Sequence, residues 1–246
     1  MKKILVSFFL GIILFLQNLV AQNDTLTNNV RKVTLCKKAI IPTALIGIGL
    51  LVQKENEFYS RYDARRDIQN QFPDFHTSID DYLPFAPLAA VYMLDFSGIK
   101  GEKPLLEFSK IMIVSQALNM GIVYAIKETS NVERPDASAN NSMPSGHTAF
   151  AFASATLFYE QYKEKGWLYQ VTPFVVAGTT GIFRMMNNRH WLSDVLVGAG
   201  IGILTTEFVW HYYPRIFPAR KKTKPDFVLF PTIQNKKFTA SLLICF

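Results

Sequence analysis

Cysteine is scarce in this chain of 246 residues. Only Cys36 and Cys245 are present, so the sequence predicts no disulfide framework. It also contains no compact cluster of carboxylates of the kind that binds Mg²⁺, and no cluster of histidine and cysteine of the kind that binds Zn²⁺. The formal net charge is +7, yet the basic residues form no stripe with interleaved aromatic residues. We therefore expect neither a metal cofactor nor a nucleic-acid partner.

Charged residues are also few, at 18%, whereas hydrophobic residues make up 49% and the mean hydropathy is +0.13. This composition is typical of a membrane protein. Small residues such as Gly198, Gly200 and Gly202 allow helices to pack closely, as in membrane bundles. We expect an all-α fold, a membrane-embedded helical bundle with about five or six core helices. The apolar runs are Ala39 to Val52, Leu83 to Phe96, Ile111 to Ile126, Ala149 to Tyr159, Trp167 to Ile182 and Trp191 to Trp210.

The two ends of the chain differ from this apolar centre. Met1 to Ala21 combines two lysines, an apolar stretch and a small final residue, which predicts a signal peptide cleaved after Ala21, with an uncleaved anchor as the alternative. After Pro214, the segment RIFPARKKTK is typical of a basic cytoplasmic juxtamembrane segment. Two apolar stretches on either side of residues 234–237 predict a short β-hairpin tail.

Two polar loops between the apolar runs carry the groups that bind an anion. Phosphoryl transfer depends on positioning and on neutralising negative charge, so several cations must converge with backbone donors. Lys127, Arg134 and Arg184 supply such cations. Ser145 and Gly146 directly precede an apolar run, so they are expected at a helix N-terminus, where free N–H groups and the helix dipole favour an anion. The pattern predicts a phosphate site.

The same loops contain the groups that a phosphoryl transfer needs. His190 and Asp194 are four residues apart, so if a helix begins near His190 they share one face and the carboxylate can hydrogen-bond the imidazole. That contact fixes the tautomer and makes the other ring nitrogen a nucleophile. His147 remains as the acid that protonates the leaving oxygen.

Three motifs carry a resemblance to a known family. Lys-x6-Arg-Pro, Pro-Ser-Gly-His and Arg-x5-His-x3-Asp, in this order, resemble the signature motifs of the type 2 phosphatidic acid phosphatase superfamily, which includes bacterial acid phosphatases and vanadium haloperoxidases. The resemblance extends from about Tyr82 to Pro214. It implies that His190 forms a phosphohistidine, Asp194 orients it and His147 is the acid. The phosphate-binding residues that it implies are Lys127, Arg134, Ser145, Gly146 and Arg184. One position departs from the pattern: Phe183 stands where the family usually has a serine, so a hydroxyl donor is lost.

The resemblance to leader-bearing bacterial members implies a metal-independent phosphatase that acts on a membrane lipid, with lipid A favoured. No cofactor is implied, and vanadate is expected only as an inhibitor. The alternatives are a phosphatase for undecaprenyl diphosphate, phosphatidylglycerophosphate or phosphatidic acid, and a non-specific periplasmic acid phosphatase. An oxidase of the haloperoxidase kind and a non-catalytic binding protein are further alternatives.

The expected division of the chain follows from these assignments. Residues 56–82 mix charges of both signs with aromatic residues, which suggests an amphipathic lid or interfacial helix near the mouth of the site, or else a solvated linker. The expected parts are a signal peptide at 1–21, an N-terminal segment with a short apolar or interfacial helix and a periplasmic lid at 22–81, a phosphatase core at 82–214, and a basic juxtamembrane segment and tail at 215–246.

The lysines between the apolar runs predict the orientation in the inner membrane. Lys100, Lys103 and Lys163 lie in segments opposite the two site loops, so the positive-inside rule places the site at the periplasmic face, with a wholly periplasmic protein as the alternative. A cleaved leader starts the mature chain outside, and six crossings would then put the site in the cytoplasm. One run must therefore not cross. We expect this of Ala39 to Val52, because such a run makes a helix of only ~21 Å, and we then expect Cys36 in the periplasm.

Overall fold

The computed structural model describes residues 27–54, 59–217, 226–234 and 237–245. The chain falls into two units, residues 1–212 and 213–246, and each is considered by itself. The signal peptide predicted at 1–21 lies outside the described residues. Side chains are described for residues 37–54 and 59–217.

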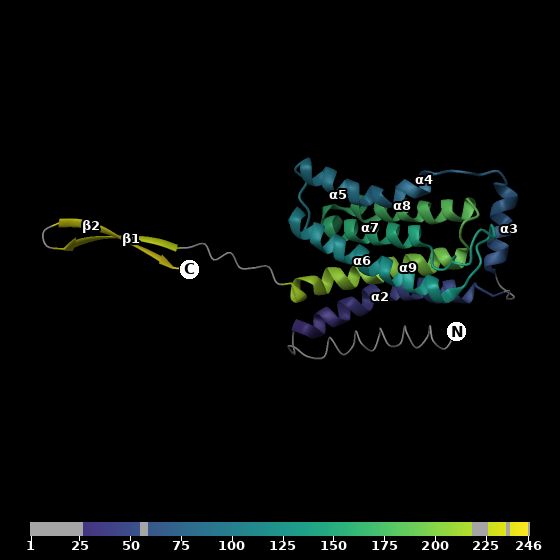
Figure 1. Ribbon diagram of the computed structural model, residues 1–246, viewed down its shortest axis with the longest axis horizontal. Coiled ribbons are helices and arrows are strands. Elements are labelled where there is room, and N and C mark those ends of the chain that lie inside the picture. The colour runs from purple at the N-terminus through teal and green to yellow at the C-terminus, as the bar shows by residue number, and fades with distance from the viewer. Residues whose placement is uncertain (1–26, 55–58, 218–225, 235–236, 246) are drawn as a thin grey trace. The chain divides into compact units, whose positions relative to one another are not determined.

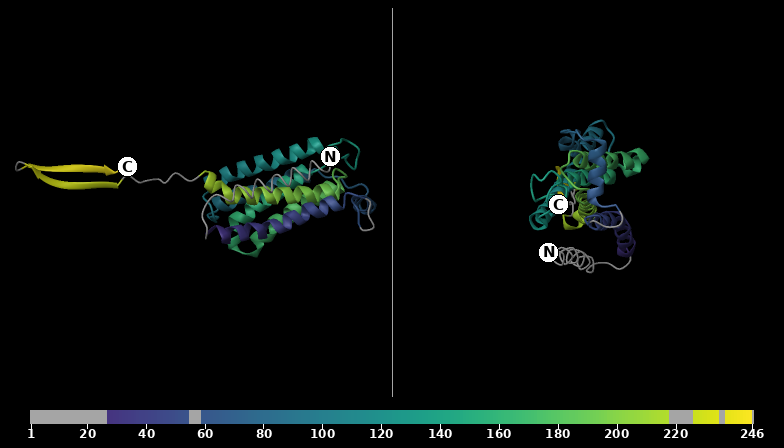
Figure 2. Two further views of the ribbon diagram at one scale, coloured as in Figure 1. Left: turned by 90° about the horizontal axis from the view of Figure 1, so that it is seen from below. Right: turned by 90° about the vertical axis from the view of Figure 1, so that its right-hand side faces the viewer.

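The first unit is an all-α bundle, which confirms the predicted fold class (Figure 1). Long helices run along it, while α3 lies across the end that carries the two polar loops (Figure 2, right). A short helix and a 3₁₀ turn lead into α5. The helices are α2 (Thr27–Leu51), α3 (Arg61–Gln71), α4 (Ile79–Tyr82), η1 (Leu83–Phe85), α5 (Ala86–Phe96), α6 (Leu105–Ser130), α7 (Gly146–Tyr162), η2 (Lys163–Lys165), α8 (Trp167–Met186) and α9 (Leu192–Ile216).

Helix α9 packs closely against its neighbours through glycine. A Cβ atom added to Gly198 would lie 2.6 Å from the carbonyl oxygen of Ser145 in front of α7, and one added to Gly200 would lie 2.5 Å from the carbonyl oxygen of Pro42 in α2. Gly202 lies against the carbonyl of Ala149 in the same way. Larger side chains at these positions would push the helices apart, so the glycines hold α9 next to the start of α7.

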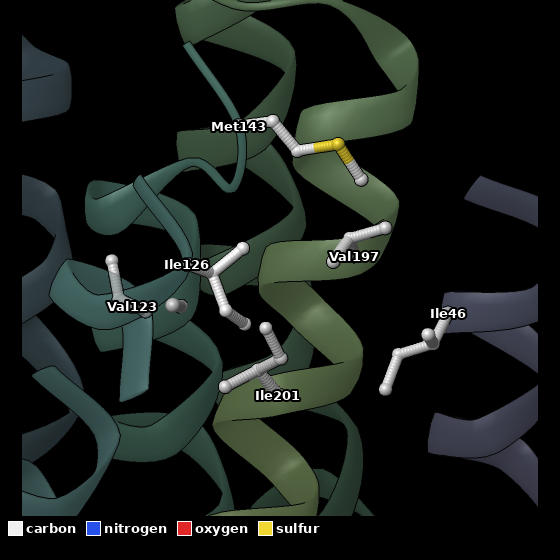
Figure 3. Close-up of a cluster of buried hydrophobic side chains, with 7 residues drawn as sticks. Ile46, Val123, Ile126, Met143, Val197 and Ile201 are labelled. Atoms are coloured by element: carbon white, nitrogen blue, oxygen red, sulfur yellow. The ribbon is translucent and has the colours of Figure 1, made fainter. Parts of the chain in front are cut away.

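A buried apolar cluster joins the helices to the first polar loop. Ile126 of α6 lies beside Ile201 of α9, Ile46 of α2 lies on the other side of α9, and Met143 belongs to the same cluster from the loop before α7 (Figure 3). The remaining members are Val123, Ala149 and Val197. Because Met143 is only 3% exposed, the loop that carries Ser145 is anchored in the core.

Helix α2 is much longer than the apolar run within it, and the prediction of a short helix was wrong. It has 25 residues, which corresponds to roughly 37 Å, because the helix continues through the polar residues before Ala39. Its Lys38 binds Glu160 near the end of α7, whereas Gln53 just after it donates to Sδ of Met143 in the site loop at 2.7 Å. The helix therefore runs from the end opposite the site to the site itself. Cys36, two residues before Lys38, belongs to the end opposite the site.

Two helices, α6 and α9, are long and apolar enough to cross a membrane by length and composition. In the second unit, β1 (Asp226–Gln234) and β2 (Lys237–Cys245) pair antiparallel, with Asp226 opposite Cys245 and Gln234 opposite Lys237. The strands occupy the two apolar stretches from which the sequence predicts a hairpin.

Candidate active site

The loop after α6 folds back over the last turn of that helix. Asn131 ends α6 in the left-handed conformation, with φ 48°, and the amide of Ser142 donates to the carbonyl oxygen of Val132 at 2.8 Å. Lys127, in the last turn of α6, donates to the carbonyl oxygens of Asn141 at 2.5 Å and Ser142 at 3.4 Å. The helix end thus fixes the Lys127 ammonium at the mouth of the loop.

The start of α7 has the geometry that the sequence predicts for an anion site. Ser145 is its N-cap, and its Oγ accepts from the amide of Thr148 at 3.4 Å. The amide of Ser145 donates to the carbonyl oxygen of Asp194 at 3.0 Å, which ties the two polar loops together. A Cβ atom at Gly146 would lie 4.0 Å from Cε of Lys127, so the lysine side chain passes beside the helix N-terminus. Free N–H groups and an ammonium therefore converge there.

His190 and Asp194 meet, although by a different local geometry from the one expected. Helix α9 begins at Leu192, so His190 precedes it and the two residues do not share a helical face. Asp194 lies in the first turn, where its Oδ2 accepts from the amide of Trp191 at 2.9 Å. The same oxygen lies 3.5 Å from Nδ1 of His190. The cap of α9 holds the carboxylate beside the imidazole.

Ser142 is a third member of this group that the motif pattern does not reveal. Its Oγ donates to Oδ2 of Asp194 at 2.5 Å and lies 3.4 Å from Nδ1 of His190. Ser142 and Asp194 have no exposed surface, and His190 is 3% exposed. Ser142 comes from the first loop and its partners from the second, 48 and 52 residues away, so no local spacing predicts it.

Burial lowers the pKa of His190 to about 4, and the charges of Lys127 and Arg184 act in the same direction, although Asp194 opposes them. The imidazole is therefore neutral at pH 7. Because Nδ1 faces Asp194 and Ser142, Nε2 is the nitrogen on the far side of the ring. A neutral imidazole with an oriented ring has the form that a nucleophile needs.

Arg184 and His147 face a pair of carboxylates that the sequence prediction missed. Nη1 of Arg184 donates to Oδ2 of Asp80 at 2.8 Å and to Oδ1 of Asp81 at 3.2 Å. The same oxygen of Asp81 lies 3.2 Å from Nε2 of His147. Asp80 is 1% exposed, whereas the side chain of Asp81 is 54% exposed. Arg184 and His147 therefore converge on one point, which the anionic Oδ1 of Asp81 occupies.

Three cations lie close to this point. Lys127, Arg134 and Arg184 are close enough for their charges to act on one another. Burial lowers the pKa of Arg134, and Arg184 and Arg189 lower it further, while Asp136 opposes them. Nε of Arg134 and Nε of Arg184 are buried without a hydrogen-bond partner. A bound anion would satisfy donors of this kind.

Two further features bear on the predicted chemistry. Phe183 packs its ring against Phe75, with 5.5 Å between centroids, so the residue that replaces the usual serine contacts the segment after α3. In the described part of the chain, no three histidine, cysteine or acidic side chains are arranged to hold a metal ion.

Comparison with known proteins places this site in a family. Residues 124–218, which contain all eight predicted site residues, match the PAP2 superfamily. The matched residues include all three motifs, so the resemblance seen in the motifs is confirmed over this part of the chain.

The particular relatives are bacterial. The chain is 46% identical over 147 residues to the lipid A 1-phosphatase of Porphyromonas gingivalis, covering 58% of this chain and 32% of the relative. It is 36% identical over 77 residues to the bacitracin transport permease protein BcrC of Bacillus licheniformis, covering 31% of this chain and 36% of the relative. The chain thus spans about a third of the length of both relatives.

A solved structure of low sequence identity is similar in fold. The transmembrane PAP2 type phosphatidylglycerolphosphate phosphatase from Bacillus subtilis has a TM-score of 0.52 and 17% identity, covering 73% of this chain and 99% of that one. LpxE of Aquifex aeolicus has a TM-score of 0.49 and 24% identity, covering 64% of this chain and 99% of that one.

Proposed function

We propose that this chain is a metal-independent phosphatase that removes a phosphate group from a membrane lipid through a phosphohistidine at His190. The observation that carries the proposal is a buried, neutral His190 that is held by Asp194 and Ser142. Beside it, Nε of Arg134 and Nε of Arg184 are buried without hydrogen-bond partners. The similarity to a lipid A 1-phosphatase favours a lipid A-type substrate.

In the proposed first step, Nε2 of His190 attacks phosphorus and the bond from phosphorus to the lipid oxygen breaks. His147 in its protonated form gives its proton to the leaving oxygen, so the lipid departs as an alcohol and His147 becomes neutral. In the second step, neutral His147 takes a proton from water, the resulting hydroxide attacks the phosphohistidine, and inorganic phosphate leaves. Lys127, Arg134, Arg184 and the N–H groups of α7 stabilise the charge on the equatorial oxygens.

Exposed apolar side chains support a location in the bilayer. Leu106, Ile113 and Tyr124 on α6 are 71%, 61% and 65% exposed, and Val175 on α8 is 59% exposed. A soluble protein rarely leaves so many large apolar side chains exposed to water. Lipid tails would cover them.

We further propose that the site faces the periplasm. Lys100, Lys103 and Lys163 lie between helices at the end of the bundle opposite the site, which the positive-inside rule assigns to the cytoplasm. The start of α2 lies at that same end, because Lys38 binds Glu160. If the leader is cleaved, the start of α2 lies outside the membrane. In a membrane-spanning bundle, the site at the other end of α2 would then face the cytoplasm. A cleaved leader and a periplasmic site are therefore compatible only in a wholly periplasmic protein.

Cysteine labelling in intact spheroplasts tests this orientation. In a variant with Arg66→Cys, Cys36→Ser and Cys245→Ser, a membrane-impermeant maleimide should label position 66, because Arg66 lies on α3 at the site end with its side chain 64% exposed. In a Cys245→Ser variant, Cys36 should react only after the membrane is dissolved in detergent. The opposite pattern would place the site in the cytoplasm, and labelling of both in intact cells would favour a periplasmic protein.

Lipid mass spectrometry of a deletion strain tests the substrate. Loss of the enzyme should leave one lipid class with an additional phosphate, and the wild-type gene should reverse the change while His190→Ala should not. An unchanged lipid A with accumulated undecaprenyl diphosphate, phosphatidylglycerophosphate or phosphatidic acid would move the assignment to that lipid. Purified enzyme should keep its activity in EDTA.

A further inference from the structure

A second pocket lies beside the catalytic site, under α3. Two of its lining residues connect it to the site: Arg134 belongs to the predicted phosphate-binding set, and Trp191 directly follows His190. Lys127, His147, Arg184 and His190 do not line it. The remaining lining residues are Arg61, Tyr62, Arg65, Asn131, Val132, Glu133, Pro135 and Ala137. The pocket is therefore a neighbour of the reacting centre and separate from it.

The arginines that line this pocket are held in place by aromatic rings. The Arg61 guanidinium lies 4.8 Å from the ring centroids of both Tyr62 and Trp191, and that of Arg65 lies 5.6 Å from the Trp191 ring. Cation–π contacts of this kind orient a guanidinium, and Nη2 of Arg61 also donates to Oη of Tyr62 at 2.8 Å. Nε of Arg61 is buried without a hydrogen-bond partner, as is Nε of Arg134. Buried donors without partners are costly, and an anion in the pocket would satisfy them.

Helix α3 is a fixed wall of the pocket. Its first turn is capped by Ser60, whose Oγ accepts from the amide of Asp63 at 3.3 Å. Nε of Arg65 donates to Oδ1 of Asn188 at 2.9 Å, and Nε2 of Gln69 donates to the carbonyl oxygen of Met186 at 3.1 Å. The helix is thus attached to the loop that carries His190, so the distance between pocket and nucleophile is set by the fold.

The charge of the pocket is strongly positive. Arg61, Arg65 and Arg134 contribute three guanidinium groups, and Glu133 is the one acidic residue among the lining residues. The carbonyl oxygen of Glu133 accepts from Nε1 of Trp191 at 2.7 Å. Glu133 itself is exposed. Guanidinium groups are well suited to phosphate because they offer paired donors.

We propose that this pocket binds a second phosphate group of the same lipid headgroup, one that the enzyme retains. The enzyme would then select a headgroup with two separated phosphates and set which of them reaches His190. This assignment rests on the proposed phosphatase function and deepens it. The cleaved phosphate is held by Lys127, Arg184 and the start of α7, and Arg134 lies between the two phosphates because it also lines the pocket. Arg61 and Arg65 are left for the retained group.

The test compares two substrates in detergent micelles: a disaccharide lipid of the lipid A type with two phosphate groups, and the same lipid without the phosphate that is not cleaved. Wild-type enzyme should show a higher kcat/KM for the bisphosphorylated lipid. Arg61→Gln and Arg65→Gln should each lower the ratio of the two kcat/KM values by roughly tenfold, mainly through KM, because each removes a charged hydrogen bond to the retained phosphate. Arg66→Gln is the matched control, because Arg66 lies on the same helix, pairs with Asp63 and does not line the pocket.

The outcomes separate the pocket from the function on which it rests. Hydrolysis of neither lipid by the wild type would contradict the proposed function. Equal kcat/KM for both lipids, or a ratio that Arg61→Gln leaves unchanged, would contradict the pocket alone. A third arm adds anionic phospholipid to micelles of the monophosphorylated lipid. Stimulation that Arg61→Gln removes would show that a neighbouring headgroup fills the pocket, and would overturn its assignment to the substrate's own phosphate.

Discussion

The two ends of the bundle both gather charged side chains, but they use them differently. At the end opposite the site, Lys38 binds Glu160 at 2.5 Å and Glu207 at 2.8 Å, and Lys163 binds Glu160 at 2.8 Å. Both of these lysines therefore have carboxylate partners. These contacts join α2 to α7 and α9, so the charges connect helices.

At the site end, cations keep buried donors without partners. Arg184 has Asp80 and Asp81, yet its Nε has no partner, and the same is true of Nε of Arg134. Donors left in this state reduce stability, and they are the donors that a phosphate can use. The comparison teaches that charged groups whose donors are satisfied within the fold support structure, whereas buried donors left without partners are available to a ligand.

The largest effect should follow from a change at the site end. Asp194→Asn removes the charge beside Nδ1 of His190 while keeping the size of the side chain. We expect kcat to fall by about 10³- to 10⁴-fold, because the imidazole loses the group that fixes its tautomer. The measurement is steady-state hydrolysis of an aryl phosphate, with thermal unfolding as the control for folding. A loss of less than tenfold in folded enzyme would contradict the role of Asp194.

A change at the opposite end should affect stability and spare catalysis. Lys38→Met leaves Glu160 and Glu207 without their common cation, and we expect a loss of about 3 kcal/mol in the free energy of unfolding, measured by denaturant titration. The triple variant Lys38→Met, Glu160→Gln, Glu207→Gln should recover much of the loss. If Lys38→Met lowered kcat/KM of the folded enzyme as strongly as Asp194→Asn, the two ends would not have separate roles.

A smaller effect should come from Asp81, whose carboxylate contacts both Arg184 and His147. Asp81→Asn removes a negative charge from the place where an anion binds. We expect vanadate to inhibit the variant at roughly fivefold lower concentration, because about 1 kcal/mol of repulsion is lost. Asp67→Asn on the exposed face of α3 is the control and should leave inhibition unchanged. Weaker inhibition of the Asp81 variant would mean that the carboxylate orients Arg184 and His147 for the anion instead of competing with the anion for them.

The smallest effect concerns pH. The pKa of His190 is lowered to about 4, so the neutral nucleophile persists between pH 6.5 and pH 4, where an ordinary histidine becomes protonated. The rate of phosphoenzyme formation, measured by rapid quench and corrected for substrate ionisation, should stay nearly constant from pH 7 to pH 5. A tenfold decline over that range would show that His190 titrates as an ordinary histidine.

How far the sequence predicts this site depends on how far apart the partners lie in the chain. The motifs predict the site residues because each lies in or directly beside one of two loops with recognisable spacing. These residues are Lys127, Arg134, His147, Arg184 and His190. Asp80 escapes prediction because it meets Arg184 across 104 residues, and nothing near it in the sequence marks the contact.

The length of α2 escapes prediction for the same reason. Its apolar run is short, but the helix extends through polar residues, and Lys38 in that extension finds Glu160 and Glu207 at separations of 122 and 169 residues. The glycines of α9 were predictable, because a small residue permits close helix packing whatever its partner is.

Trapping the phosphoenzyme tests the central claim most directly. Enzyme mixed with a ³²P-labelled aryl phosphate and quenched in alkaline SDS should carry label that is stable in alkali and lost in acid, as a phosphohistidine is. His190→Ala should carry none, whereas His147→Ala should still be labelled, because an aryloxide leaves without a proton and the step that needs His147 as base is slowed. Label on His190→Ala, or label that resists acid, would contradict a phosphohistidine at His190.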